Sequence, residues 1–367
     1  MFTDIVILAG GAGTRLWPAS VAKSPKQFMS VEGGRSFFRM ALERALALGP
    51  SGSVLVVCGA AQQDALLSEV EAFPEARGRV LVLPEPRARN TAPAVAAALA
   101  LLEKPRLPGR ARAPSAGGSA LLLTSDHLIK PVEAFVADAA RASALAEAGN
   151  LVCFGVKPRG PSTGYGYLET AAPLGPGYKV ARFREKPDRA TAESFLAAGN
   201  FYWNSGMYGW RFDLMREELE TRAPEVAAAF APLAAAEPRF AERSGAFVLE
   251  AWNGLAAAYD AAPAISLDYA VSEKCPRVAL VPAAFDWDDV GSWDEFAALF
   301  SGHSGEVVEP GSKGCFVYSD LPVALCGVED LVVVVKHGAV LVARKGETQR
   351  VKDAVEAWKA LGRSDLL

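Results

Sequence analysis

The sequence has few of the residues that bind transition metals or build disulfide frameworks. Its 367 residues include three histidines and five cysteines. The histidines lie far apart in the chain, and no two cysteines have CxxC spacing. A disulfide framework, a thiolate zinc site and a histidine-rich metal site are therefore not indicated. We expect any metal ion to be held by oxygen ligands, as Mg2+ usually is.

The sequence also lacks a strong charge excess and a long apolar run at its start. Lys and Arg total 38 against 42 Asp and Glu, a formal net charge of −4, so no basic surface for nucleic acid is predicted. The first residues, MFTDIVILAGG, carry an acid at Asp4 and only a short apolar run, unlike a signal peptide or a membrane span. We expect a cytoplasmic protein that binds neither nucleic acid nor membranes.

The first part of the sequence alternates between apolar runs and segments with helical periodicity. The runs lie at residues 5–9, 54–58, 80–83, 120–124 and 151–156. Such near-continuous apolar strands suit a parallel sheet that is covered on both faces. We therefore predict an α/β fold with a Rossmann-like domain, in which a mixed, mainly parallel sheet carries helices on both faces.

Two later segments have a different character. Residues 104–119 are rich in Pro, Gly and Arg and contain no acid, which indicates a solvated connection. From about residue 305, short strand-like runs alternate with Gly or Pro. Because one core usually stops growing at this chain length, we predict a large domain over residues 1–300 and a small β-rich domain over residues 301–367. We expect the small domain to pack against the large one or against a second subunit.

A glycine-rich loop directly follows the first predicted strand. Within residues 8–28, LAGGAGTRLWPASVAKSPKQF, the glycines Gly10, Gly11 and Gly13 would let the backbone turn tightly and present N–H groups to phosphate oxygens. Leu16 stands where the dinucleotide fingerprint has its third glycine, and no GK[ST] follows, so neither that fingerprint nor a P-loop is present. The pattern fits a phosphate-binding loop and also a plain strand-to-helix turn.

Two cations accompany this loop. Arg15 lies within it, and Lys26 follows eleven residues later. Such a pair could converge on a pyrophosphate whose negative charge grows in a transition state. Taken alone, each could equally be a surface cation.

The loop resembles the signature of the sugar-nucleotide pyrophosphorylases. Its GGAGTRLWP and SPKQF segments are similar to the version found in mannose-1-phosphate guanylyltransferases. Seven further segments resemble that family in the same order, namely PEPRARNTAPA (84–94), TSDHLI (124–129), GVKPRGPSTGYGYLE (155–169), FREKP (183–187), NFYWNSGMYGW (200–210), ISLDYAVSEK (265–274) and WDDVGSW (287–293). The resemblance therefore covers most of the chain.

The resemblance implies a nucleotidyltransferase domain over residues 1–300 that joins GTP and α-D-mannose 1-phosphate to give GDP-mannose and pyrophosphate. The 1-phosphate oxygen would attack the α-phosphorus in line with Mg2+ as cofactor, and the rate would come from positioning and charge neutralisation. A homodimer is also implied. The cupin-like domain of the bifunctional members does not follow the ARKGETQRVKD segment, so we expect no isomerase activity.

The same resemblance assigns site residues at the positions that match. The catalytic cations are Arg15 and Lys26. The nucleotide-binding residues are Leu8, Ala9, Gly10, Gly11, Gly13, Thr14, Glu85, Asn90, Thr91 and Ser125. The sugar-phosphate-binding residues are Gly166, Glu185, Lys186 and Asn204, and the metal ligands are Asp126 and Asp289.

Physical chemistry agrees with several of these assignments. Asp126 follows an apolar strand, so it would lie at the carboxyl end of that strand, where ligands bind in open α/β sheets. Two carboxylates together with phosphate oxygens match the way Mg2+ is held, although the choice of Asp289 over Asp288 rests on the resemblance alone. The Lys186 ammonium suits a sugar phosphate, and the Glu185 carboxylate suits sugar hydroxyls. A turn residue or a surface ion pair stays the alternative for each of them taken singly.

Other residues in these motifs have structural explanations. Thr91 would cap the helix predicted from about Ala92 to Glu103, which leaves Arg89 and Asn90 without a structural explanation. His127 is expected to be structural, because a sugar phosphate is already ionised near neutral pH and the reaction needs no general base. The aromatic side chains of the motifs are expected in the core more than in ligand contact, namely Tyr165, Tyr202 and Trp203.

Three positions depart from the family pattern. Val21, Ala88 and Ser162 stand where an arginine, a glycine and an acid are usual, and these changes bear on the sugar and the base rather than on the reaction. One alternative is a pyrophosphorylase for another nucleotide and hexose 1-phosphate. Another is a non-catalytic subunit that senses nucleotide sugars, which would be expected to lose the loop cations or metal carboxylates. The glycine spacing disfavours a dehydrogenase.

Overall fold

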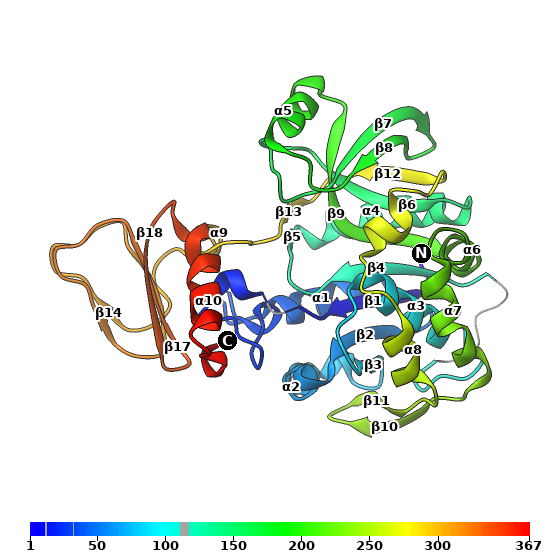
Figure 1. Ribbon diagram of the computed structural model, residues 1–367, viewed down its shortest axis with the longest axis horizontal. Coiled ribbons are helices and arrows are strands. Elements are labelled where there is room, and N and C mark those ends of the chain that lie inside the picture. The colour runs from blue at the N-terminus through cyan, green and yellow to red at the C-terminus, as the bar shows by residue number, and fades with distance from the viewer. Residues whose placement is uncertain (12, 32, 111–116) are drawn as a thin grey trace.

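A large mixed sheet runs through the centre of the molecule (Figure 1). The computed structural model describes residues 1–11, 13–31, 33–110 and 117–367. In chain order the strands of this sheet are β1 (Asp4–Ala9), β2 (Val54–Gly59), β3 (Val80–Glu85), β4 (Ser119–Thr124), β6 (Leu151–Val156), β7 (Tyr167–Leu174), β8 (Gly177–Arg184), β9 (Phe201–Arg211), β10 (Arg239–Arg243), β11 (Ala246–Ala251) and β12 (Val278–Pro282). Their spatial order is β10-β11-β3-β2-β1-β4-β9-β6-β12-β8-β7.

The two halves of the sheet differ in strand direction. The five apolar runs form β1, β2, β3, β4 and β6, and β1 pairs parallel with both β2 and β4. β9 enters between β4 and β6 and pairs antiparallel with both, and β7, β8 and β10 also pair antiparallel. The mixed sheet is therefore confirmed, but its parallel part is confined to β11-β3-β2-β1-β4 and to the β6–β12 pair.

Helices cover both faces of this sheet, as predicted. Alternate side chains of β1 enter different cores, with Ile5 and Ile7 in one apolar cluster and Val6 in the other. The first cluster is covered by α1 (Phe37–Ala47), α2 (Gln63–Glu71) and α4 (Val132–Glu147). The second is covered by α3 (Thr91–Leu102), α6 (Phe212–Arg222), α7 (Pro224–Phe230) and α8 (Leu255–Ala261). α5 (Arg189–Ala198) packs against β9.

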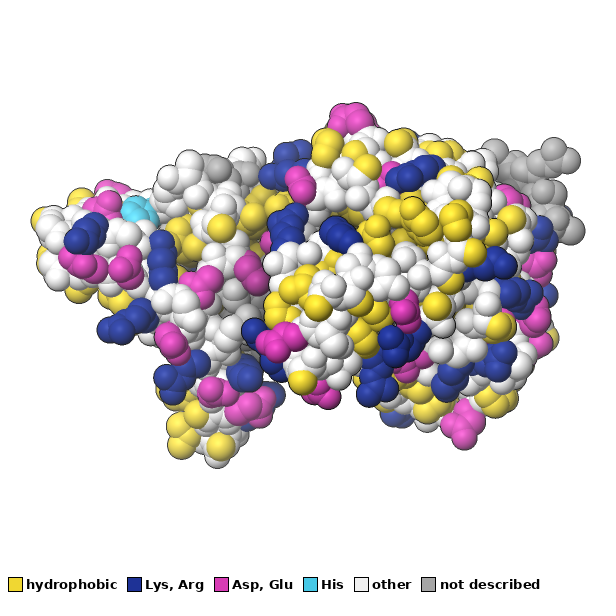
Figure 2. Space-filling view, turned by 90° about the horizontal axis from the view of Figure 1, so that it is seen from above, with side chains coloured by type: hydrophobic (Ala, Val, Ile, Leu, Met, Phe, Trp, Pro, Cys, Tyr) yellow, Lys and Arg dark blue, Asp and Glu magenta, His cyan; other side chains and the backbone are white. Residues whose placement is uncertain are grey.

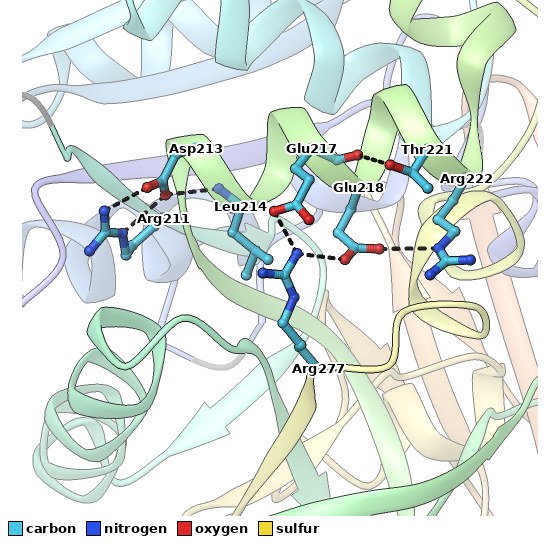
Figure 3. A network of polar contacts seen from close by, with 8 residues as sticks. All are labelled: Arg211, Asp213, Leu214, Glu217, Glu218, Thr221, Arg222 and Arg277. Atoms are coloured by element: carbon cyan, nitrogen blue, oxygen red, sulfur yellow. Dashed lines mark hydrogen bonds and ion pairs between the residues drawn. The ribbon is translucent and has the colours of Figure 1, made fainter.

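The polar face of α6 is fixed to the turn before β12 by ion pairs (Figure 3). One guanidinium nitrogen of Arg277 lies 2.7 Å from Glu217 Oε2 and 3.0 Å from Glu218 Oε1. Glu218 also lies 3.5 Å from Arg222 Nε. The Glu218 side chain is buried. These ion pairs therefore hold α6 against the sheet in addition to the contacts of its apolar face.

The connection between α3 and β4 is only partly solvated. Residues 111–116 of the predicted solvated stretch lie outside the described residues. At its start, Lys104 is buried, because its Nζ donates to Ala234 O at 2.7 Å. The predicted solvation of residues 104–119 is therefore wrong for Lys104, whose ammonium contacts a backbone carbonyl instead of water.

Short elements link the larger ones. β5 (Leu128–Lys130) pairs antiparallel with β13 (Asp286–Asp288), and α9 (Trp293–Ala297) follows. Single helical turns are η1 (Thr14–Leu16), η2 (Lys26–Phe28), η3 (Ala60–Gln62), η4 (Pro74–Ala76), η5 (Ala231–Ala235), η7 (Thr348–Arg350) and η8 (Ser364–Leu366), and η6 (Asp268–Ser272) is a π-helical turn. The pairing of β5 with β13 brings the segment after β4 beside a segment far along the chain.

The C-terminal part is rich in short strands. β15 (Phe316–Ser319), β17 (Leu331–Lys336) and β18 (Ala339–Arg344) form one sheet, β14 (Val307–Val308) pairs with β16 (Val323–Ala324), and α10 (Val351–Ala360) follows. A third apolar cluster joins Leu16 and Trp17 to Phe316, Val332 and Val355. The C-terminal part therefore packs against the large lobe of the same chain, one of the two placements expected (Figure 1).

The surface carries charge of both signs. On the face shown in Figure 2, basic and acidic side chains are interspersed, in agreement with 38 Lys and Arg against 42 Asp and Glu. Among the described residues, no helix is both long and apolar enough to cross a membrane.

Candidate active site

A cavity of about 270 Å³ lies where the loops after β1, β4 and β13 meet. Its lining consists of Gly13, Thr14, Arg15, Leu16, Lys26, Asp126, His127, Asp289, Val290 and Gly291. Both predicted catalytic cations and both predicted metal ligands therefore line one cavity, although they come from distant parts of the sequence.

The glycine-rich loop can pack beside Lys26 only because position 13 has no side chain. Gly13 has φ +54°, and a Cβ atom there would lie 2.7 Å from Lys26 Cβ and 2.8 Å from Ser20 Oγ. Both the left-handed backbone and the close approach therefore require glycine. Gly10 and Gly11 are exposed, as a loop that offers its N–H groups to a ligand must be. Residue 12 of the same motif lies outside the described residues.

Backbone carbonyls at the end of β1 anchor this loop to its neighbours. Gln27 Nε2 donates to Ala9 O at 2.8 Å, and the buried Ser125 donates its N–H to Leu8 O at 3.2 Å. Three predicted nucleotide-binding positions, Leu8, Ala9 and Ser125, thus already have backbone partners within the protein. Thr14 lines the cavity itself.

Lys26 links the two predicted metal ligands. Its ammonium is buried, lies 3.0 Å from Asp126 Oδ2 and also donates to the backbone carbonyl of Asp289. Burial would by itself raise the pKa of Asp126, but the Lys26 ammonium holds that pKa below its ordinary value. Asp126 is therefore ionised at neutral pH and suited to bind a cation.

The Asp289 carboxylate belongs to a group of three acids. Carboxylate oxygens of Asp288, Asp289 and Glu295 lie within 4.8 Å of one another. Asp126 is not in this group, although it lines the same cavity. Burial raises the pKa of both Asp288 and Glu295, and the neighbouring Asp289 adds to it. A group made only of carboxylate oxygens has the donor chemistry that Mg2+ and Ca2+ prefer.

Local backbone geometry sets this acidic group opposite the glycine-rich loop. A Cβ atom at Gly291 would lie 3.5 Å from Asp289 Oδ2 and 3.6 Å from both Arg15 Nη1 and Glu295 Oε2. Asp288 Oδ1 accepts the N–H of Val290 at 2.7 Å, which fixes the turn. Position 291 therefore lies between Arg15 and the carboxylates, and a Cβ atom there would be in ordinary contact with both.

Tyr165 and Glu295 border the acidic group, and sequence reasoning missed Glu295. The Tyr165 hydroxyl donates a hydrogen bond to Asp289 Oδ1, while its ring packs edge-on against Trp203 and Trp287 at 4.9 and 5.1 Å. The expectation that Tyr165 is a core residue holds for its ring and not for its hydroxyl. Glu295 lies just beyond the WDDVGSW motif, and the sequence signal for it is an acid in the first turn of a short helix.

His127 supports the loop after β4. Its Nδ1 accepts a hydrogen bond from Trp287 Nε1 at 3.1 Å, so its Nε2 carries the proton and lies 3.7 Å from Asp126 Oδ1. Arg44, a buried residue of α1, donates to the His127 carbonyl at 3.2 Å. Burial lowers the pKa of His127, which keeps the ring neutral. The geometry agrees with the structural place expected for this histidine.

The predicted nucleotide end lies beside this cavity. Glu85 ends β3 and is 9% exposed, and a Cβ atom at Gly10 would lie 3.3 Å from its Oε2. Within the described residues, neither Glu85 Oε1 nor the buried hydroxyl of Tyr259 makes a hydrogen bond of good geometry, although the two groups lie close enough for Tyr259 to lower the pKa of Glu85. Burial raises the pKa of Glu85 to about 7. A buried carboxylate oxygen without a donor is costly unless a ligand supplies one.

The start of α3 differs from its predicted form. The N-cap residue is Asn90, whose side chain accepts the N–H of Thr91 at 2.8 Å. Thr91 instead accepts the N–H of Leu267 at 2.7 Å through its hydroxyl. The prediction that Thr91 caps the helix is therefore wrong, because Asn90 tolerates the positive φ of 67° at the cap. Arg89, unexplained from sequence, donates to Tyr259 O at 2.9 Å.

The predicted sugar-phosphate residues form a second cluster. A Cβ atom at Gly166 would lie 2.5 Å from Glu185 Oε2, so this position packs closely against the carboxylate. Glu185 Oε1 lies 3.0 Å from Lys186 Nζ, and the Glu185 N–H donates to Glu273 Oε1 at 2.8 Å. Burial, followed by the charge of Asp268, raises the pKa of Glu185.

Asn204 uses its amide group within the protein. Its Nδ2 donates to Tyr208 OH at 2.7 Å and to Asp268 Oδ1 at 3.0 Å, and its Oδ1 accepts the N–H of Gly206 at 3.1 Å. Tyr208 also donates to Asp268. Sequence reasoning missed Asp268, whose only signal is its place in the ISLDYAVSEK motif. The sugar cluster meets the cavity through Tyr165, the residue before Gly166.

Comparisons with known families divide the chain into two matched parts. Residues 4–303 match the family described as Nucleotidyl transferase. Residues 305–357 match the family described as MannoseP isomerase/GMP-like beta-helix domain.

The chain is similar to curated proteins over nearly all of its length. It is 37% identical over 383 residues to the xanthan biosynthesis protein XanB of Xanthomonas campestris pv. campestris (strain B100), covering 98% of this chain and 74% of that protein. It is 33% identical over 377 residues to the mannose-1-phosphate guanylyltransferase of Escherichia coli (strain K12), covering 98% of this chain and 74% of that protein.

Solved structures share the arrangement as well. A crystal structure from Thermus thermophilus, described as a mannose-1-phosphate geranyltransferase, is 30% identical with a TM-score of 0.81 and covers 98% of this chain and 100% of that chain. A Helicobacter pylori structure described as mannose-6-phosphate isomerase is 25% identical with a TM-score of 0.63, covering 78% and 100%.

Proposed function

We propose, on the premise that this chain belongs to the nucleotidyl transferase family, that it transfers GMP from GTP to α-D-mannose 1-phosphate and releases GDP-mannose and pyrophosphate. The observation that carries the chemistry is the cavity in which Arg15, Lys26, Asp126 and Asp289 meet. The similarity to a mannose-1-phosphate guanylyltransferase supports the choice of substrates.

The reaction is a displacement at phosphorus. An oxygen of the sugar 1-phosphate forms a bond to the α-phosphorus of GTP, the bond between the α-phosphorus and the bridging oxygen breaks, and pyrophosphate takes the electron pair. The attacking oxygen is already ionised, so no general base is required. Arg15 and Lys26 orient the triphosphate and stabilise the charge that grows on the leaving group.

The metal in this proposal is Mg2+, and Asp126 and Asp289 are its ligands. Both side chains line the cavity and offer only oxygen atoms, which fits a hard divalent cation. When bound, the ion neutralises phosphate charge. Lys26 pairs with Asp126, so its ammonium would hold that proposed ligand beside the triphosphate.

Glu85 is the proposed reader of the base. Guanine presents two adjacent donors, N1–H and the N2 amino group, and a carboxylate accepts from both. Glu85 Oε1 is buried without a partner, so guanine would supply the missing donor. The remaining proposed nucleotide contacts are Leu8, Ala9, Gly10, Gly11, Gly13, Thr14, Asn90, Thr91 and Ser125.

The sugar phosphate is proposed to lie against the second cluster. Lys186 is the proposed phosphate contact, because its side chain is 58% exposed beside the buried Glu185. Glu185, Asn204 and Gly166 are the proposed contacts of the sugar ring. We further propose the division at residue 300, a homodimer without nucleic-acid partners, and a cytoplasmic location.

Pyrophosphate release by the purified protein tests this function. GTP, ATP, UTP, CTP and dTTP are each offered with Mg2+ and mannose 1-phosphate, and glucose 1-phosphate is then offered with the preferred nucleotide. The expected result is the fastest release with GTP and mannose 1-phosphate. A different preferred pair would keep the mechanism and discard the base and sugar. No release from any pair, by folded protein that binds a nucleotide, would favour the sensing subunit.

A further inference from the structure

Two loops of the cavity are both anchored to the C-terminal part of the chain. One is the η1 loop with Arg15, and the other is the turn 289–291 that leads into α9. Among the described residues, none from 301–367 lines the cavity. Contacts from that part can therefore act on the site only through the loops that they hold.

Asp294 of α9 is held by the turn after β18. Its Oδ1 accepts the N–H of Gly346 at 2.9 Å, and its Oδ2 accepts the hydroxyl of Thr348 at 2.6 Å. The Asp294 N–H donates back to Thr348 Oγ1 at 3.2 Å. Thr348 is 1% exposed, so water cannot replace these bonds without a rearrangement. The acidic group with Asp289 and Glu295 is thereby fixed to the C-terminal part.

Trp17, two residues after Arg15, holds the other loop. Its indole Nε1 donates to Leu366 O at 2.7 Å, and its ring lies 6.3 Å from that of Trp358 on α10. Its carbonyl accepts from Trp293 Nε1 of α9 at 2.9 Å. Trp17 and Trp293 are both buried in the apolar cluster that joins the two parts.

We propose that Thr348 and Trp358 are positioning residues that set the spacing between Arg15 and Asp289. This inference rests on the proposed function, because only a reaction at the cavity gives that spacing a kinetic meaning. The C-terminal part holds the η1 loop with Arg15 through Trp17, and it holds the turn 289–291 through Asp294. Both sides of the cavity are therefore held against one support before substrates bind, and less ordering remains for the reaction step.

Thr348→Val and Trp358→Leu in the full chain test this proposal. Each is expected to lower kcat by about tenfold, up to on the order of 10²-fold for a misplaced reacting group. The KM for mannose 1-phosphate should change little, because its proposed contacts lie in the second cluster. The dissociation constant of GTP, followed by tryptophan fluorescence, should rise. Thr348→Ser, which keeps the hydroxyl, should restore wild-type values.

Controls separate positioning from general weakening. Thr221→Val removes one hydroxyl, which bonds to Glu217 O at 2.7 Å on α6 (Figure 3), and should leave kcat unchanged. The proposal would be overturned if both Thr348→Val and Trp358→Leu kept wild-type kcat and GTP affinity. It would also be overturned if the variants only melted at a lower temperature and kept wild-type kcat at assay temperatures below their melting point. If the wild type releases pyrophosphate from no pair, the proposed function fails, and GTP affinity alone decides the positioning. If Thr348→Val does not fold, Trp358→Leu decides.

Discussion

The nucleotide end and the sugar end of the candidate site differ in how far their polar atoms are already paired. At the nucleotide end, Glu85 Oε1 is buried without a hydrogen bond of good geometry within the described part of the chain, and Tyr259 lies beside this carboxyl group. At the sugar end, Asn204, Tyr208 and Asp268 hydrogen-bond to one another. The acceptor Glu85 Oε1 is thus open to a donor from a ligand, whereas the contacts among Asn204, Tyr208 and Asp268 are assembled before any ligand arrives.

This difference bears on where specificity can arise. A buried acceptor without a donor penalises every ligand that cannot supply one, so the nucleotide end should discriminate sharply. A preorganised cluster orients a ligand with little further ordering, so the sugar end should contribute mainly to positioning.

Asp289→Asn should have the largest effect, because Asp289 lies between the two ends. It lines the cavity and receives the Tyr165 hydroxyl from the sugar side. We expect kcat to fall on the order of 10²–10³-fold, the size typical of one lost electrostatic contact to the reacting charge. Pyrophosphate release over a range of Mg2+ concentrations measures it. Asp213→Asn, at an exposed carboxylate of α6, serves as the control, and turnover near that of the wild type would refute the proposed metal ligand.

The pH dependence of stability isolates Glu85. Burial raises its pKa from 4.5 to about 7 in the folded chain, so the folded chain keeps a proton that the unfolded chain loses. The contribution of Glu85 to the free energy of unfolding is complete below about pH 4.5. It declines as the pH rises and is lost above about pH 7, a difference of about 3 kcal/mol. Urea unfolding at several pH values should show this decline, and Glu85→Gln should flatten it. Parallel curves for the two proteins would contradict the prediction.

Glu85→Gln should also weaken the choice of base. A glutamine can accept only one of the two guanine donors and places its own amino group against the other. We expect the preference for GTP over the other nucleotides to drop by about 1–3 kcal/mol, or roughly fivefold to 150-fold. Values of kcat/KM for each nucleotide measure it, with the KM for mannose 1-phosphate as the internal control. An unchanged preference would remove Glu85 from the base site.

Asn204→Ala should have the smallest effect. Tyr208 still donates to Asp268 in this variant, so the cluster loses only one member. We expect a loss of stability of about 1 kcal/mol and a rise of a few-fold in the KM for mannose 1-phosphate, with base preference intact. Thermal unfolding and steady-state kinetics measure these. A change in base preference would show that the two ends are not separate.

Local patterns in the sequence were enough to predict the first strands and the loop. The apolar runs became β1 to β4 and β6, since strand formation there follows from hydrophobic periodicity. Asp126 could be placed beside the loop because both follow neighbouring strands of a parallel sheet. The position of β9 could not be predicted, because antiparallel insertion between β4 and β6 depends on pairings between distant segments.

The finer design of the site depends on contacts that no local pattern contains. The bridge from Lys26 to Asp126 and Asp289 spans three distant segments. Asp289 reaches the cavity because two three-residue strands, β5 and β13, pair with each other, and such short strands have little periodicity to detect. Tyr165 was predicted to be a core residue because its ring is apolar. Its contact with Asp289 depends on the direction of its hydroxyl, which no sequence pattern contains.

The tight contact at Gly13 limits how this site could be redesigned. A side chain there would collide with the Cβ atom of Lys26 and with Ser20, so this wall of the cavity offers no room for mutational libraries. Variation aimed at unnatural sugars or nucleotides would have to start elsewhere, at Asn204 or Glu85. Position 13 therefore has to remain glycine in any variant that is engineered to accept new substrates.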